Sequence, residues 1–367
     1  MPPKPTLLLN REIGILEFNR SVLAQAEDPD TPLLERLKFL CIVSSNLDEF
    51  FEIRVAELKE TIRVNLSATG PDGMSPLEVF AAVNRIAHEL VERQYRLLNE
   101  KILPELDKAG VRFLRRNDLN EAQRAWIRDY FFNEMMPVLT PIGLDPAHPF
   151  PRVFNKSLNF AVELEGRDAF GRASRDAIVQ APRILPRMIK LPPELRQGKE
   201  QSFVFLSSVL HEHASELFAG MSVRGCYQFS VTRNSDLFVD EEEVKNLRTA
   251  LQGELPQRNL GAAVRLEIAD NCTQAMAEFL LQQTELGPED LYRVNGQVNL
   301  VRLMQIPELV NRPDLQFPAF RPGRPAALEK GPIFSPQYAR VTCCCITRSS
   351  RSRQWSISSR RRPLTSR

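Results

Sequence analysis

A polar cluster at residues 44–49, with the sequence SSNLDE, holds the side chains of this chain that are best suited to chemistry. Asn46 offers both hydrogen-bond donors and an acceptor, a set that suits a nucleobase edge or a phosphate group. The same residue is also a candidate helix N-cap, because Glu49 follows three positions later and would complete a capping box. Spacing alone favours the cap, and a ligand contact stays open as the alternative.

The acidic pair Asp48-Glu49 could act as two catalytic carboxylates. Adjacent residues on a helix point to different faces, however, so a solvent-exposed helix face or a cap is the stronger interpretation. Arg54 and Arg63 could hold a phosphate group, although most such arginines are surface charges. These residues are therefore candidates for binding, without an assembled catalytic site.

The histidines of the chain are His88, His148, His211 and His213, and they do not follow the spacing of a metal site. His211 and His213 are two positions apart and diverge on a helix, while the proline-rich surroundings of His148 favour a packing role. The cysteines are either isolated or consecutive, unlike the spaced pairs of a zinc site. We find no Walker-type loop, Rossmann fingerprint or nucleophile elbow. The residues alone predict no complete catalytic constellation.

Helical segments must position the polar cluster. Apolar residues recur at helical spacing in residues 10–28, in residues 32–60 and in residues 76–108. Asn10 is a suitable N-cap for the first segment, and Phe18 is expected on its apolar face. Glycine and proline turn signals predict a loop at 66–75. We therefore expect a three-helix bundle as a first domain, residues 1–109.

Residues 110–305 carry a different pattern, in which short strand-like runs alternate with helical runs. The expected strands are 158–164, 177–180, 203–206, 226–232 and 264–268, and the expected helices are 120–136, 207–217, 241–252 and 272–283. This mixture predicts an α+β head domain, so the fold class is α+β multidomain. Residues 306–340 are expected to form an extended proline-rich linker, followed by a disordered tail at 341–367.

The composition excludes several classes of protein. The chain has 367 residues, 43% hydrophobic and 26% charged, which is ordinary for a globular protein. Without the seven arginines after residue 341, 41 basic residues face 46 acidic ones, so we expect no nucleic-acid partner. The sequence has no apolar run of 18 residues, and its N-terminal run is too short for a signal peptide, so we expect no transmembrane segment and a cytoplasmic location.

Two long blocks carry a family resemblance. Residues 9–28, followed by TPLLERLKFLCIVSSNLDEFFEIRVAELK, closely resemble the start of bacterial polyphosphate kinases of the phosphohistidine type. HPFPRVFNKSLNFAVELE, LFAGMSVRGCYQFSVTRNSDL and LYRVNGQVNLVRLMQI resemble segments of the head domain of that family. The resemblance covers about residues 7–340.

The resemblance implies an enzyme that transfers the ATP γ-phosphate reversibly to inorganic polyphosphate through a phosphohistidine. It implies ATP contact by Asn46, which matches the asparagine of the family's NLDEF motif. It also implies Mg²⁺, a homo-oligomer that assembles through the head domain, and a cytoplasmic or peripheral inner-membrane location. The family's nucleophilic histidine and metal ligands belong to two C-terminal domains and have no counterpart here. The alternative is a non-catalytic assembly or interaction module.

Residues 341–367 do not resemble a natural domain end, because they contain three consecutive cysteines and arginine is their only charged residue type. One interpretation is a disordered basic tail. Our hypothesis is a frameshift: codons that encode residues 341–352, read two bases later, can give DVLLHHPFESF, which resembles the start of the family's third domain. The nucleotide sequence of these codons tests the hypothesis.

On that hypothesis the chain is a truncated polyphosphate kinase that is inactive alone. Phosphoryl transfer needs a nucleophile, charge neutralisation and in-line positioning, and we expect that none of the three can be assembled from residues 1–340 alone. We predict negligible ATP-dependent polyphosphate synthesis by the purified chain. Synthesis above a no-enzyme control would refute this prediction.

Overall fold

The computed structural model describes residues 8–64, 69–145, 147–167, 175–196, 200–235 and 261–318. The expected helix at 241–252, the linker from residue 319 onward and the tail at 341–367 lie outside these residues. The described residues up to Gln316 belong to one compact unit.

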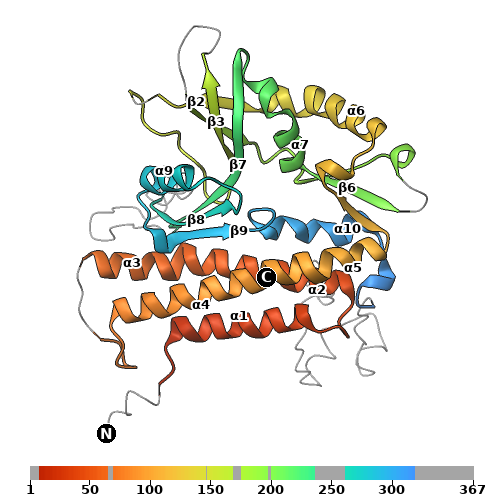
Figure 1. Cartoon of the computed structure of the whole chain (residues 1–367). Coiled ribbons are helices and arrows are strands. Elements are labelled where there is room, and N and C mark those ends of the chain that lie inside the picture. The colour runs from red at the N-terminus through yellow and green to blue at the C-terminus, as the bar shows by residue number, and fades with distance from the viewer. Residues whose placement is uncertain are drawn as a thin grey trace, which may run out of the picture. The chain divides into compact units, whose positions relative to one another are not determined.

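The predicted three-helix bundle is confirmed (Figure 1). Its helices are α1 (Arg11–Glu27), then α2 (Leu33–Glu49) continued by the π-helical turn η2 (Phe50–Val55) and α3 (Ala56–Arg63), and finally α4 (Pro76–Leu97) continued by η3 (Leu98–Ile102) and α5 (Leu103–Lys108). Asn10 caps α1 as expected, because its side chain accepts from the backbone N–H groups of Glu12 and Ile13. Ser75 and Glu78 form a capping box that begins α4.

The buried stripe of α1 follows the spacing Leu16, Asn19, Leu23, Ala26. The expectation that Phe18 lies on the apolar face is wrong: its ring is 62% exposed. The stripe passes through the neighbouring position instead, so a fully buried asparagine stands in line with the leucines. A polar side chain therefore enters the bundle core between α1 and α2.

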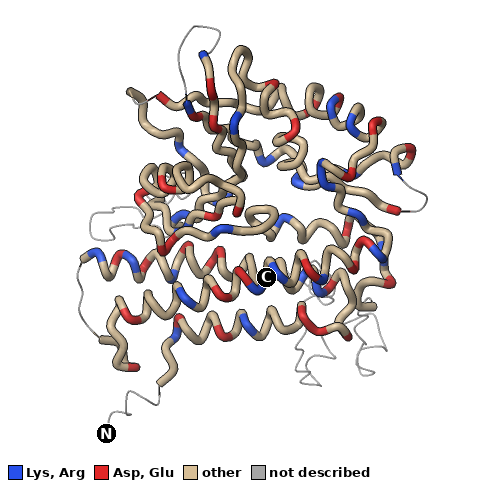
Figure 2. Tube along the Cα trace, in the orientation of Figure 1, with Lys and Arg blue, Asp and Glu red and all other residues tan. Residues whose placement is uncertain are grey.

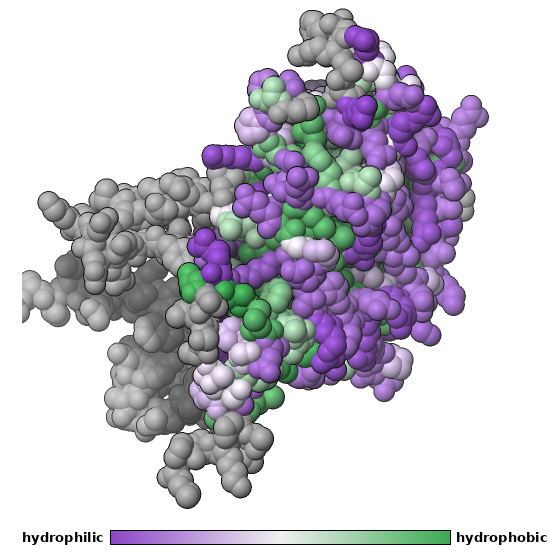
Figure 3. Space-filling model, turned by 60° about the vertical axis from the view of Figure 1, so that its left-hand side comes forward, coloured by the Kyte–Doolittle hydropathy of each residue, from purple (hydrophilic) through white to green (hydrophobic). Residues whose placement is uncertain are grey.

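Charges of both signs are interspersed along the bundle helices (Figure 2). Arg20 and Arg85 both contact Glu89, at 2.8 Å each, and Arg93 pairs with Glu27. These pairs are exposed and contribute little stability each. On the face shown in Figure 3, hydrophilic side chains surround a smaller area of hydrophobic ones.

The head contains two sheets, which confirms the predicted α+β class. A six-stranded sheet has the order β2-β4-β3-β7-β8-β9, and a three-stranded sheet has the order β1-β6-β5. The strands are β1 (Val111–Leu114), β2 (Thr140–Gly143), β3 (Leu158–Gly166), β4 (Asp176–Ala181), β5 (Met188–Lys190), β6 (Gln201–Phe205), β7 (Met221–Arg233), β8 (Ala263–Ala269) and β9 (Leu291–Val294). β1 pairs with β6, and β8 with β9, in parallel; the other pairs are antiparallel.

Sequence reasoning missed β1, β2, β5 and β9. Each has at most four residues, which is too short for a period-two pattern to stand out. β2 also contains Pro141, which is tolerated because the strand lies at the edge of its sheet. Its position was set by pairing with β4 rather than by local pattern.

Helices cover both faces of the large sheet. The head helices are α6 (Glu121–Tyr130), α7 (Leu206–His213) and α9 (Gln274–Thr284). α9 packs Met276 and Leu280 against one face, in a cluster with Phe229 and Ile268 of the sheet. The opposite face joins the bundle in one continuous hydrophobic core, in which Phe160 and Tyr292 share a cluster with the leucines of α2. Within the large sheet, β8 and β9 are the strands nearest the bundle helices (Figure 1).

The expectation of an extended linker is wrong for residues 306–316. η11 (Leu300–Gln305) leads directly into α10 (Ile306–Val310), and the 3-10 turn η12 (Pro313–Leu315) follows. Ile306 and Val310 are buried four positions apart on one helical face. Lys190 of β5 donates to the carbonyl of Leu309 at 2.7 Å, which ties α10 to the small sheet. The division between the two domains at residue 109 stays a prediction.

None of the helices in the described ranges is long and apolar enough to span a bilayer.

The docking of α10 leads to a test. Ile306→Ala removes a fully buried side chain, so we expect the free energy of unfolding to fall by about 2–4 kcal/mol. Leu309→Ala, at a neighbouring position that is 38% exposed, should cost less than about 1 kcal/mol. Denaturant unfolding of both variants provides the measurement, and equal effects would mean that residues 306–310 do not pack as described.

Candidate functional site

Asn46 lies within α2, and its side chain lines a cavity of about 430 Å³ between α1 and α2. The N-cap interpretation is wrong, because α2 begins at Leu33 and runs through Asn46 into the π-helical turn without a break. The capping box with Glu49 therefore does not form. The apolar stripe continues on both sides of the polar cluster, with Leu40 and Phe51 buried, and this keeps the segment helical.

The side chain of Asn46 is held by Asn19 of α1. The Asn46 amide nitrogen donates to the Asn19 carbonyl oxygen at 2.9 Å. Asn19 is fully buried, and its own amide nitrogen has no partner among the described residues. An unpaired buried amide of this kind lowers the stability of the fold, so its presence in the bundle core needs an explanation. Asn19 was missed by the sequence reasoning; the signal was a polar residue in the stripe of Leu16 and Leu23.

The rest of the cavity wall combines an aromatic ring with charges. The exposed Phe18 ring stands beside Asn19, and Ile15 and Ile53 add apolar surface. The cations that line it are Arg11, which is exposed, and Arg54.

Arg54 is already engaged by carboxylates. It donates to Glu12 and, at 2.6 Å, to Glu57. The hydrogen bond to Glu12 raises the pKa of Arg54 above its ordinary value. Arg63 lies on the exposed end of α3, where it pairs with Glu60 at 2.8 Å, and it does not line this cavity. Of the two arginines that the sequence proposed for phosphate, only Arg54 is at the site.

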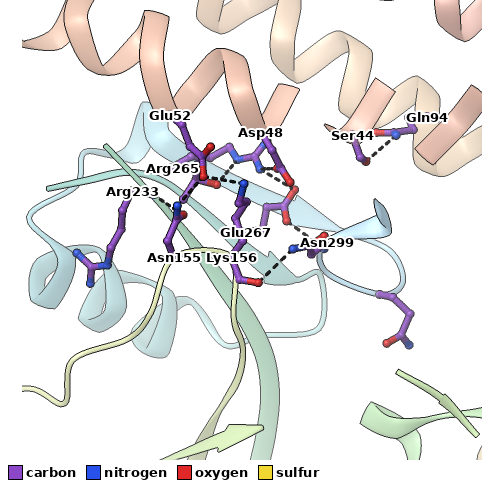
Figure 4. A network of polar contacts seen from close by, with 12 residues as sticks. Ser44, Asp48, Glu52, Gln94, Asn155, Lys156, Arg233, Arg265, Glu267 and Asn299 are labelled. Carbon is purple, nitrogen blue, oxygen red and sulfur yellow. Dashed lines mark hydrogen bonds and ion pairs between the residues drawn. The ribbon is translucent and has the colours of Figure 1, made fainter. Parts of the chain in front are cut away.

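Asp48 points away from solvent and pairs with a buried arginine of the head (Figure 4). Arg265 of β8 donates to the Asp48 carboxylate at 2.5 Å, and Glu267 lies 3.6 Å from the same guanidinium nitrogen. The Arg265 guanidinium also lies over the ring of Phe51, 4.8 Å from its centroid, and 5.8 Å from that of Tyr292. The expectation that Asp48 lies on a solvated face is therefore wrong, whereas Glu49 is exposed as expected.

Burial governs the charge of this pair. Burial raises the pKa of Asp48 to about 6, and the positive charge of Arg265 opposes the rise. The two carboxylates near Arg265 raise the pKa of the guanidinium, which remains protonated. Neither Asp48 nor Glu49 has the geometry of a paired catalytic acid and base, because one is sealed in the core and the other faces water.

One helical turn further along, Glu52 anchors the loop before β3 (Figure 4). Its carboxylate accepts from the Asn155 amide at 2.5 Å and pairs with Lys156 at 2.7 Å. The side-chain oxygen Oδ1 of Asn155 in turn accepts from the backbone N–H of Arg233 at 2.9 Å. The proline-rich run at 148–157 thus serves to bring Asn155 and Lys156 onto the bundle.

The histidines do not gather at the cavity. His88 stacks on Tyr292 with ring centroids 3.9 Å apart. Burial lowers the pKa of His211 and His213, both in α7. His148 is exposed, so the expected packing role is wrong for it. None of the four lines the cavity that contains Asn46.

Sequence reasoning also missed Arg265 and Glu267. Both lie in β8, whose sequence AVRLEIA alternates charged with apolar residues. That pattern ordinarily indicates one solvated face. Here the charged face is buried against α2, so only the tertiary structure reveals the ion pair.

Comparison with known sequences identifies the family. A profile described as "Polyphosphate kinase middle domain" matches residues 122–306, and one described as "Polyphosphate kinase N-terminal domain" matches residues 8–114. The chain belongs to the polyphosphate kinase family. The expected resemblance is confirmed.

Individual proteins that match this chain are also polyphosphate kinases. The chain is 58% identical over 325 residues to a polyphosphate kinase of Burkholderia cenocepacia, covering 89% of this chain and 47% of the relative. It is 56% identical over 328 residues to one of Neisseria meningitidis, covering 89% and 48%. The crystal structure of polyphosphate kinase from Porphyromonas gingivalis superposes with a TM-score of 0.71 at 25% identity, covering 90% of this chain and 45% of that one. The chain spans about half the length of the relatives that it matches.

The Asp48–Arg265 pair leads to a test. Arg265→Leu leaves two buried carboxylates without their counter-charge, so we expect the free energy of unfolding at pH 7 to fall by about 3–5 kcal/mol. Arg224→Leu is the matched control: it removes an exposed strand arginine paired with Glu165 and should cost less than about 1 kcal/mol. Equal losses in chemical denaturation would contradict a structural role for the buried pair.

Proposed function

We propose that this chain is the nucleotide-contacting part of an ATP–polyphosphate phosphotransferase, with Asn46 as its ATP contact. The observation that carries the proposal is the open cavity at Asn46, in which one amide group is held by Asn19 and its carbonyl oxygen has no protein donor among the described residues. An oxygen left open in this way can accept from an exocyclic amine such as that of adenine. The exposed Phe18 ring in the same wall offers a surface for stacking a base.

The family relation supports the type of reaction. The relatives are named polyphosphate kinases, and the proposed reaction is the reversible transfer of the ATP γ-phosphate to inorganic polyphosphate through a phosphohistidine. All four histidines of the sequence lie in the described residues, and none lines the Asn46 cavity. In this proposal the chain therefore binds and orients the nucleotide, while the histidine that takes up the phosphoryl group is not one of these four.

The residues at the cavity do not fit a Mg²⁺ site. Mg²⁺ prefers several oxygen ligands, usually carboxylates, waters and substrate phosphates. The lining residues include one carboxylate, Glu49, beside the guanidinium groups of Arg11 and Arg54. We derive no step through a metal at this cavity.

Homo-oligomer assembly through the head domain and a cytoplasmic location, peripheral at the inner membrane, complete the proposal. A non-catalytic assembly module is the alternative. Light scattering coupled to size-exclusion chromatography measures the assembly, and nucleotide binding separates the two functions.

ATP binding tests the role of Asn46. Asn46→Ala removes one hydrogen bond to the nucleotide, so we expect the dissociation constant for ATP to rise about tenfold in calorimetry. Ser45→Ala is the matched control, because Ser45 is the preceding, exposed residue of the same helix and does not line the cavity. Unchanged ATP affinity in Asn46→Ala, or no ATP binding by the parent chain, would rule the proposal out.

Asn19→Leu separates binding from folding in the same experiment. Leucine continues the buried stripe of α1 and removes the unpartnered amide, so the thermal midpoint should not fall. ATP affinity should fall nonetheless, because Asn46 loses the partner that orients it.

A further inference from the structure

A second cavity, of about 310 Å³, lies in the head at the carboxyl ends of the two parallel strand pairs. β1 ends at Leu114 and leads into Arg115 and Arg116, and β6 leads into Ser207 and Ser208 at the start of α7. Asn271 follows β8 and Gln297 follows β9 in the same way. Carboxyl ends of parallel strands are a recurrent position for ligand sites, because the loops that leave them converge there.

The lining of this cavity is rich in hydrogen-bond donors and carries no carboxylate. Two arginines, two serines, two asparagines, two glutamines and a histidine make up the wall with Ala269. Arg115 has no ion-pair partner among the described residues. Arg116 lies 3.7 Å from Glu212, but that carboxylate also lies 3.3 Å from Arg124. The local balance is therefore positive.

Several groups of the wall are held in place from behind. Ser207 donates to the side-chain carbonyl of Gln297 at 2.7 Å, and the amide of Gln228 donates to the backbone carbonyl of Gly296 at 2.7 Å. The remaining oxygen of Gln228 is buried without a hydrogen-bond partner among the described residues. This oxygen is an acceptor, so it can pair with a water or with the hydroxyl of a monoprotonated phosphate, and the attraction for an anion comes from the donors of the wall.

The first turn of α7 adds a further attraction for anions. Its N-cap, Phe205, provides no side-chain acceptor for the backbone N–H groups of that turn, of which that of Leu206 donates to the carbonyl of Arg187 at 2.9 Å. Helix N-termini attract phosphate groups for this reason, here beside the hydroxyl groups of Ser207 and Ser208. Among the lining residues His211 carries the only ring, so the wall offers little surface for stacking a nucleobase.

We propose that this cavity binds a phosphoryl oxyanion through Arg115, Arg116 and the start of α7. Arg115, Ser208 and Gln297 also line an adjoining cavity of about 440 Å³, whose wall includes Arg112 together with Asp107 and Asp118. Asp107 already pairs with Arg112 at 2.8 Å, and both carboxylates disfavour phosphoryl oxygens, so the proposed site is confined to the first cavity. Guanidinium groups suit this chemistry because they bind phosphate oxygens in pairs.

Binding of inorganic tripolyphosphate to the purified chain tests the site. The choice of this probe rests on the proposed function, whereas the anion chemistry of the cavity does not. Arg115→Gln should raise the dissociation constant for tripolyphosphate about tenfold in calorimetry at 0.15 M salt. The control Arg85→Gln removes the same charge from an exposed helical site outside the cavity and should change it less than twofold.

Comparison of ligands distinguishes the source of the oxyanion and the two sites. Tighter binding of tripolyphosphate than of orthophosphate assigns the site to a polyphosphate chain, and equal Arg115-dependent binding assigns it to free phosphate. Asn46→Ala should weaken ATP binding and leave tripolyphosphate binding unchanged, so failure of one proposal does not decide the other. Absence of tripolyphosphate binding, or equal losses in Arg115→Gln and Arg85→Gln, overturns the oxyanion site.

A labelling experiment gives a second readout that needs no variant. Phenylglyoxal should modify the exposed Arg115 in the free chain, and tripolyphosphate should protect it by at least severalfold, as measured by peptide mass spectrometry. Arg85 should be labelled equally in both samples. Equal labelling of Arg115 with and without tripolyphosphate would contradict the site.

Discussion

The buried ion pair between Asp48 and Arg265 is the constraint on which the arrangement of bundle and head depends. Removing two charges from water is costly, and the cost is offset only when both stay in close, well-directed contact. α2 and β8 must therefore keep one relative position, and the rings of Phe51 and Tyr292 close around the guanidinium to hold it. Glu52 and Lys156 form a second ion pair between the bundle and the head, one turn further along the helix. Any slippage of the bundle against the sheet would expose an unpaired charge to the core.

The ion pair also fixes the candidate nucleotide site, because Asp48 and Asn46 lie in the same helix, α2. Asn46 lies two residues before Asp48, so the ion pair that fixes Asp48 from the head also fixes the depth and rotation of Asn46. From the other side, Asn19 holds the amide itself. The π-helical turn that follows changes the rotation of the side chains about the helix axis between α2 and α3. In α3, Lys59 pairs with Asp290 of the head. The polar cluster is thus one rigid element with an outward-facing amide and an inward-facing carboxylate.

The second cavity follows a different principle. It is built from the loops that leave parallel strands, whereas the Asn46 cavity is built between two helices. Its donors come from five separate segments that only the sheets bring together. The two proposed sites, for a nucleotide on the bundle and for a phosphoryl oxyanion on the head, are therefore separate. The continuous core beneath them keeps the two cavities at a fixed distance.

The sequence by itself determined the bundle, the class of the head and the family, because helical periodicity, caps such as Asn10 and long family-specific blocks are local properties. It pointed to Asn46, but it could not decide between a cap and an exposed contact, since that depends on whether the helix continues past it. Short strands such as β2 and β9 exist only through their pairing partners. Phe18 was expected to be buried and is exposed, and Asp48 was expected to face water and is buried, for the same reason. Which side of a helix faces water is set by what packs against it, and the partners of Asp48 and Asn19 lie far away in the chain or across the bundle.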